Sequence, residues 1–188
     1  MPTPFLLNGI LASQISGHLY SGPAGAFDAL GSVTVGSGGL SSITFSAIPQ
    51  TYTHLQIRAF GECASGDGNI NLYINGETSA NDSKYYRHFL YGNGSSAVAG
   101  SGTGSGMVPS YWPDTTHFGV FVQDILDYSN THKNKTSRAL GGQDGNGSGY
   151  VLLYSAQWMD TTAISTLTYS ANGGSFAAGT SLALYGIR

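Results

Sequence analysis

Short runs of alternating apolar and polar residues, separated by glycine-rich turns, limit most strongly what this chain can fold into. In the clearest run, residues 69–74, Ile70, Leu72 and Ile74 alternate with Asn69, Asn71 and Tyr73. A period of two places alternate side chains on opposite faces of an extended strand. Similar runs recur from Gly31 to the C-terminus, and no segment keeps a helical period beyond one or two turns. The sequence therefore predicts an all-β protein.

Turn-forming residues separate the runs, as at Asn75-Gly76 and Gly92-Asn93-Gly94, where a positive φ costs little. A sheet with one apolar face needs a second layer to cover it, and the chain offers no crossover helix. We therefore expect residues 31–188 to form an antiparallel two-sheet sandwich of eight to ten strands. A jelly roll is the leading topology and an immunoglobulin-like sandwich is the alternative. Residues 92–113 are expected to be a long irregular loop.

Charge and cysteine content exclude several classes of protein. Only 9% of the 188 residues are charged, and seven Lys and Arg leave a net charge of −3. Because no basic patch can form, we expect no binding to nucleic acid. No apolar segment approaches the length of a membrane span, so no membrane partner is expected. A single cysteine, Cys63, excludes an internal disulfide and a multi-cysteine zinc site.

Residues 41–58, SSITFSAIPQTYTHLQIR, form the most distinctive string in the chain. Two alternating runs flank the sequence Ile48-Pro49-Gln50-Thr51. Proline lacks an N–H group, so it marks a connection and not the middle of a central strand. The string is interpreted as strand, corner and strand, with Ile43, Phe45, Leu55 and Ile57 expected in the core.

This string resembles one found in virion structural proteins of tailed bacteriophages, particularly cyanophages. Two further parts of the chain resemble the same pattern: Ile74-Asn75-Gly76-Glu77 with Tyr85-Tyr86-Arg87-His88-Phe89-Leu90-Tyr91-Gly92, and the closing Leu182-Ala183-Leu184-Tyr185-Gly186-Ile187-Arg188. The resemblance implies a protein on the exterior of a virion, with a structural and non-enzymatic role. It also implies a homo-oligomer, with a trimer favoured, that contacts other virion proteins such as the major capsid protein.

Residues 1–30 differ from the rest because prolines and glycines interrupt short apolar groups. We expect this segment to be an extended N-terminal arm that attaches to a neighbouring subunit or to the particle, or alternatively packs along its own sandwich. Within the virion class, the leading expectation is a capsid decoration or cement protein. The residues expected to attach it are Phe5, Leu6, Leu7, Ile10 and Leu11.

A tail-fibre or baseplate module that recognises a host-surface glycan is the alternative function. Aromatic rings beside hydrogen-bonding groups suit sugar faces, and they suit protein interfaces equally well. Tyr111 and Trp112, which prolines flank, are expected to form a rigid anchor for a receptor or a subunit. Arg87 and His88 are expected to contribute to the same contact.

Catalytic and metal motifs are weak. Five histidines lack HxH or HExxH spacing, and no G-x-S-x-G elbow is present. Residues 144–149 resemble the start of a calcium loop, but Ser155 stands at the twelfth position, where an EF-hand has a glutamate. A flexible hairpin is therefore the preferred interpretation. Neither the pair Asp124 and Asp127 nor the pair Asp114 and Asp160 is supported as a glycosidase pair. We expect no enzymatic activity, no metal and no cofactor.

Overall fold

The computed structural model describes residues 26–66, 68–77, 84–104 and 106–188, and regular structure in these ranges is built from β-strands. The strands are β1 (Phe27–Thr34), β2 (Ser42–Phe45), β3 (His54–Gly61), β4 (Asn69–Ile74), β5 (Tyr85–Gly92), β6 (Ala97–Thr103), β7 (Met107–Tyr111), β8 (Gly119–Leu126), β9 (Lys135–Asp144), β10 (Gly149–Trp158), β11 (Leu167–Ala171) and β12 (Ser181–Ile187). The predicted attachment residues Phe5, Leu6, Leu7, Ile10 and Leu11 lie outside the described residues. No helix among the described residues is long and apolar enough to cross a membrane.

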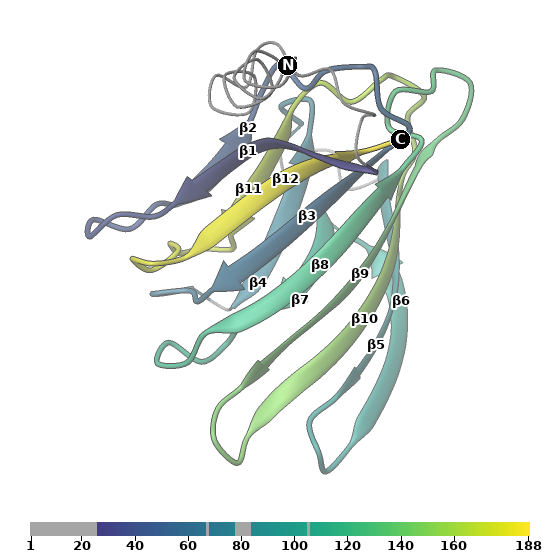
Figure 1. Cartoon of the computed structure of the whole chain (residues 1–188). Coiled ribbons are helices and arrows are strands. Elements are labelled where there is room, and N and C mark those ends of the chain that lie inside the picture. Colours follow the sequence, from purple (N-terminus) through teal and green to yellow (C-terminus); the bar gives the residue numbers. More distant parts are fainter. Residues whose placement is uncertain (1–25, 67, 78–83, 105) are drawn as a thin grey trace, which may run out of the picture.

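The strands form two antiparallel sheets that pack as a sandwich. The larger sheet has eight strands in the order β1-β12-β3-β8-β9-β10-β5-β6, and the smaller has four in the order β2-β11-β4-β7. Figure 1 shows the larger sheet in front, running from β1 and β12 to β5 and β6, with the smaller sheet behind it. This arrangement confirms the predicted two-sheet sandwich, while the jelly-roll topology stays a prediction.

The string of residues 41–58 carries the chain from one sheet to the other. Its first run is β2 in the smaller sheet, and its second run is β3 in the larger sheet. At the corner, the Tyr128 hydroxyl donates a hydrogen bond to the Pro49 carbonyl, and Gln50 Nε2 donates to the Ile164 carbonyl at 2.9 Å. Strand, corner and strand are thus confirmed, and the expected core positions are buried: Ile43, Phe45, Leu55 and Ile57.

Residues 92–113 differ from the predicted irregular loop, because they contain β6 and β7. β6 pairs with β5 through the sequence AVAGSGT, whose small residues give no visible alternation of large apolar side chains. β7 contains Pro109 but lies at the edge of the smaller sheet, where a strand tolerates a residue without an N–H group. β1 also begins earlier than expected, at Phe27, inside the predicted arm.

Two parts of the larger sheet are uncovered, and one of them follows from the different widths of the two sheets. The inner face of the larger sheet packs on the smaller sheet, whose edge strand β7 contacts β8, β9 and β10 and reaches β5 only in part. The inner faces of β5 and β6 therefore lie at and beyond the margin of the smaller sheet. The outer face of the larger sheet has no second layer among the described residues.

Candidate functional site

The outer face of the larger sheet carries an extended group of exposed apolar side chains, which we call the apolar band. Its members are between 42% and 67% exposed, although most large apolar side chains of the described residues are buried. They come from strands β3, β8, β9, β10 and β5, which lie side by side in the sheet. The band consists of Phe60, Leu90, Val120, Val122, Leu140, Val151 and Leu153.

Strand register arranges the band in two rows that run across the strands. In the first row Val122 is paired with Leu140, Leu140 with Leu153, and Leu153 with Leu90. In the second row Phe60 is paired with Val120, Val120 with Gly142, Gly142 with Val151, and Val151 with Gly92. Because directly opposed residues lie about 5 Å apart, each row is a continuous line of neighbours.

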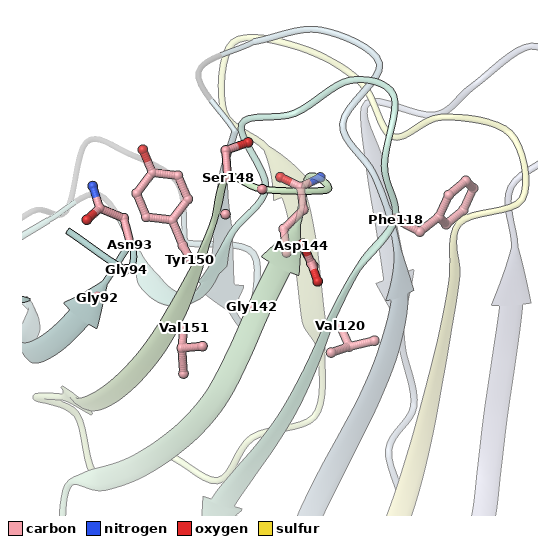
Figure 2. Close-up of a pocket in the computed structure, with 13 residues that line it drawn as sticks. Gly92, Asn93, Gly94, Phe118, Val120, Gly142, Asp144, Ser148, Tyr150 and Val151 are labelled. Atoms are coloured by element: carbon pink, nitrogen blue, oxygen red, sulfur yellow. The ribbon is translucent and has the colours of Figure 1, made fainter. Parts of the chain in front are cut away.

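Glycines make the surface of the second row uneven. Gly142 and Gly92 present no side chain, so the surface is lower there than at the valines of the same row. At Gly142 the Tyr150 carbonyl oxygen borders this low point, 2.5 Å from where a Cβ would lie. A depression of about 530 Å³ opens here, lined by Val120, Val151 and both glycines together with the 144–149 hairpin. Figure 2 shows Val120 and Val151 projecting on one side of the strands, and Tyr150 pointing away from them. A second depression of about 470 Å³ borders Leu90 and Leu153.

Polar and aromatic contacts border the band. Phe60 stacks on Phe118, with ring centroids 4.8 Å apart, which extends the apolar surface beyond β3. Next to Val122, the Arg58 guanidinium lies 5.0 Å from the centroid of the Tyr185 ring and donates to Gln56 Oε1 at 2.8 Å. Cation–π and hydrogen-bonding contacts thus hold this charge at the margin of the band.

A second candidate surface lies on the inner face, at the margin of β7. Five aromatic side chains from β5, β7 and β10 form a continuous series of ring contacts, which we call the tyrosine cluster. Adjacent centroids in the series Tyr154, Phe89, Tyr91, Tyr150 and Tyr111 are 5.2 to 6.1 Å apart. Only Tyr154 is fully buried, and its pKa is raised by desolvation.

Arg87 adds a positive charge beside the tyrosine cluster. Its side chain shares the inner face of β5 with Phe89, and its buried Nε atom has no hydrogen-bond partner among the described residues. The neighbouring edge strand β6 places no side chain beside these two residues, since Gly102 is paired with Arg87 and Gly100 with Phe89. A Cβ at position 100 would lie 2.5 Å from the Phe89 ring. The cluster therefore combines aromatic faces, hydroxyls and one guanidinium whose Nε is buried without a partner among the described residues.

The structure separates the residues that the sequence predicted to act together. Arg87 lies on the inner face of β5, whereas His88 is exposed on its outer face. Tyr111 belongs to the tyrosine cluster. Trp112 is fully buried against Phe121, at a centroid distance of 5.6 Å, so the prediction of an exposed Trp112 anchor is wrong for the single chain. Its indole is a core side chain.

The carboxylates considered as catalytic pairs are also apart and engaged. Asp114 accepts hydrogen bonds from Thr116 and contacts His117 Nδ1 at 2.7 Å; these contacts, with Thr116 first, lower its pKa to about 2. Asp160 follows the opposite end of β10, where Thr162 and Lys84 lower its pKa to about 2. No cooperating carboxylate pair therefore arises from Asp114 and Asp160.

Asp124 and Asp127 do not share a site either. Asp124 accepts a hydrogen bond from Gln56 Nε2 at 2.8 Å on the outer face of the sheet. Asp127 lies in the turn after β8, where Lys133 Nζ, 2.5 Å from its Oδ2, lowers its pKa. Each carboxylate thus has its own local partner.

The 144–149 segment is a tight β-hairpin between β9 and β10. Gly145 N donates to the Ser148 carbonyl at 2.7 Å, and Asn146 and Gly147 both have positive φ. The hairpin interpretation is confirmed. In the part of the chain that the structure describes, no group of three or more His, Cys, Asp or Glu side chains is placed to hold a metal ion.

Sequence reasoning missed the apolar band. A signal was present in β10, where Val151, Leu152, Leu153 and Tyr154 put apolar side chains on both faces in succession. Such a run is typical of a strand that is covered on both sides. Only the strand order shows that neighbouring strands extend this pattern across the sheet.

Comparisons with known proteins give only remote structural likenesses. No protein-family model and no curated protein matches the sequence. Alginate lyase Aly36B is 13% identical over 83% of this chain and 78% of its own, with a TM-score of 0.36. The marine PL-14 alginate lyase from Aplysia kurodai is 10% identical over 94% of both chains, with a TM-score of 0.39. Neither likeness carries an activity to this chain.

Proposed function

We propose that this chain is a non-enzymatic structural protein on the exterior of a bacteriophage virion, where it decorates and stabilises the capsid. The apolar band is the observation that carries the assembly role. Monomeric soluble proteins rarely expose an apolar patch that spans five neighbouring strands, and such patches mark interaction sites. The resemblance of residues 41–58 and 182–188 to virion proteins supports the choice of particle.

Burial of the band would provide the binding energy of such an assembly. Each of its side chains is about half exposed, and removing apolar surface from water stabilises a complex by roughly 25 cal/mol per Å² before ordering costs are subtracted. The border is polar, with Arg58, Gln56 and Asp124 linked by hydrogen bonds. An apolar centre inside a polar rim is the usual anatomy of a protein interface.

Purified particles of the phage that encodes the chain provide the test. We expect the protein on the capsid surface in a reconstruction, at a copy number that matches the capsid lattice. Leu140→Lys should abolish occupancy, because it places a charge in the centre of the band. Ser42→Lys, an exposed substitution on the smaller sheet, should leave occupancy unchanged. Absence of the protein from particles would refute the proposal.

Glycan recognition at a tail fibre or baseplate is the second candidate, and the tyrosine cluster favours it. Partly exposed tyrosine rings can stack on sugar faces, and a guanidinium beside them can bind hydroxyl or carboxylate oxygens. The residues that would contact a glycan are Arg87, Phe89, Tyr91, Tyr111 and Tyr150.

A glycan array on the purified chain tests this candidate. Binding should be lost in Tyr91→Ala and Arg87→Ala and retained in Tyr86→Ala, since Tyr86 is exposed on the opposite face of the same strand. Trp112→Ala is unsuitable, because it opens a cavity in the core. An array without specific binding, or binding that these variants leave unchanged, argues against glycan recognition.

A further inference from the structure

We propose that the apolar band pairs with the same band of a second copy of this chain, face to face, around a two-fold axis that runs parallel to the strands between β9 and β10. The inference rests on the proposed function in one respect, that the band is an assembly surface. A two-fold axis in this position sets β9 against β10 of the second copy, and β8 against its β5. It also sets β3 against β6, because these strands are equally far from the axis in the sheet order.

Within the first row, this arrangement brings large apolar side chains together. Leu140 faces Leu153 of the second copy, and Val122 faces its Leu90, because each pair lies in the same row of the sheet. The two-fold axis repeats each contact, so four leucine–leucine or valine–leucine contacts occupy the centre of the interface.

Within the second row, large side chains face small ones. Val151 faces the gap at Gly142 of the second copy, Val120 faces the gap at Gly92, and Phe60 faces Ala97. Side chains from two sheets must interdigitate when the sheets pack about 10 Å apart. The alternation of valine and glycine along this row supplies that interdigitation, and an axis between β9 and β10 sets both valines against glycines.

A row of polar residues lies next to the first row of the band and is also compatible with pairing. It consists of Gln56, Asp124, Arg138, Ser155 and His88. Asp124 faces His88 of the second copy, and Arg138 faces its Ser155, so no like charges oppose each other. Gln56 lies in the same row and faces Ser101. A rim of this kind remains solvated and fixes the register of the two sheets.

The size of the band fits a second copy of the chain. Seven side chains that are about half exposed present on the order of 700 Å², close to the roughly 800 Å² that each partner buries in a standard interface. Strands related by an axis parallel to them also keep the same direction, which matches the aligned packing of two twisted sheets.

Sedimentation equilibrium of the full-length chain is the direct test, and we expect a dimer. Leu140→Lys should weaken self-association at least about 100-fold, since it buries two unpaired charges per dimer. Ser42→Lys, on the exposed side of the smaller sheet, should leave the dimer unchanged. The thermal midpoint of Leu140→Lys, measured at a concentration so low that both variants are monomeric, should match that of Ser42→Lys.

A mixing experiment tests the position of the axis. Leu140→Lys and Leu153→Glu should each be monomeric alone, and a mixture of the two should form a heterodimer, because Lys at 140 then faces Glu at 153. Mixing Leu140→Lys with Phe60→Glu is the matched control, since position 60 faces Ala97 at the far side of the row. This mixture should contain no heterodimer.

Several results would overturn the pairing. A monomeric wild-type chain means that the band is covered by the chain's own apolar N-terminal residues or by another protein. A trimer, or a dimer that Leu140→Lys does not dissociate, means that a different surface joins the copies. Capsid occupancy is measured separately, so a monomer that still requires Leu140 to bind particles would refute the pairing and leave the proposed function standing.

Discussion

The ring of Tyr52 lies flat against Gly186, where a Cβ atom would come within 2.5 Å of the ring carbon Cγ. Tyr52 belongs to the string of residues 41–58, and Gly186 belongs to the closing LYGIR, so two of the strings that carry the resemblance to virion proteins meet here. On the ring, the Arg188 guanidinium lies 5.1 Å from the centroid and pairs with Asp28 at 3.0 Å. The two strings therefore contact and stabilise each other in the fold.

Gly186→Ala is expected to lower the free energy of unfolding by roughly 1–3 kcal/mol, because the added methyl group displaces the Tyr52 ring. Gly38→Ala is the matched control, since a Cβ there meets no atom within 4 Å. Urea denaturation measures both variants. In a Tyr52→Ala background the cost of Gly186→Ala should fall, and an unchanged cost would contradict a direct clash.

The sequence was sufficient to predict the sandwich but not its surfaces. Alternation in residues 41–58 and 69–74 correctly assigned β2, β3 and β4, because one face of each strand is buried. β6 was not predicted, because its small residues show no alternation of large apolar and polar side chains. Trp112 was expected at a contact surface, but its side chain is buried in the core. The sequence does not show towards which side of the edge strand β7 the next residue points.

Tyr169→Phe is expected to lower the free energy of unfolding by about 1–3 kcal/mol. The Tyr169 hydroxyl donates to Gln123 Oε1 at 2.7 Å and joins the smaller sheet to the larger one inside the core. The variant leaves a buried acceptor without its donor. Tyr86→Phe, on the exposed face, should have no measurable effect in the same denaturation assay. If the two variants lower the free energy of unfolding equally, the buried hydrogen bond between Tyr169 and Gln123 makes no specific contribution to stability.

Lys135→Met is expected to lower the free energy of unfolding by roughly 3 kcal/mol, because a buried ammonium would no longer satisfy three carbonyls. Lys135 Nζ donates to the carbonyls of Asn130, Lys133 and Thr161 at 2.5 to 3.0 Å, and desolvation lowers its pKa. Lys133→Met is the control on an exposed side chain. Thermal denaturation compares the two. Equal thermal midpoints for the two variants would show that water satisfies the three carbonyls as well as the Lys135 ammonium group does.

The candidate surfaces were beyond sequence reasoning for a physical reason. Val122, Leu140, Leu153 and Leu90 are distributed over four runs, and only the order β8-β9-β10-β5 makes them neighbours. A single strand with apolar residues on both faces indicates a covered strand in general. No local pattern shows what covers such a strand.

The stability of the protein should fall as the pH drops from about 4 towards 2, and Asp114 and Asp160 should account for part of that loss. In the folded chain both carboxyl groups have a pKa of about 2, below the ordinary value of 3.8. A carboxyl group with a lowered folded pKa binds protons more weakly than in the unfolded chain. Its stabilisation is therefore present above pH 4 and is lost as the pH falls through the folded pKa. The double variant Asp114→Asn/Asp160→Asn should show a shallower decline than the wild type in urea denaturation at a series of pH values. A double variant with the same acid dependence as the wild type would mean that other carboxylates control acid unfolding.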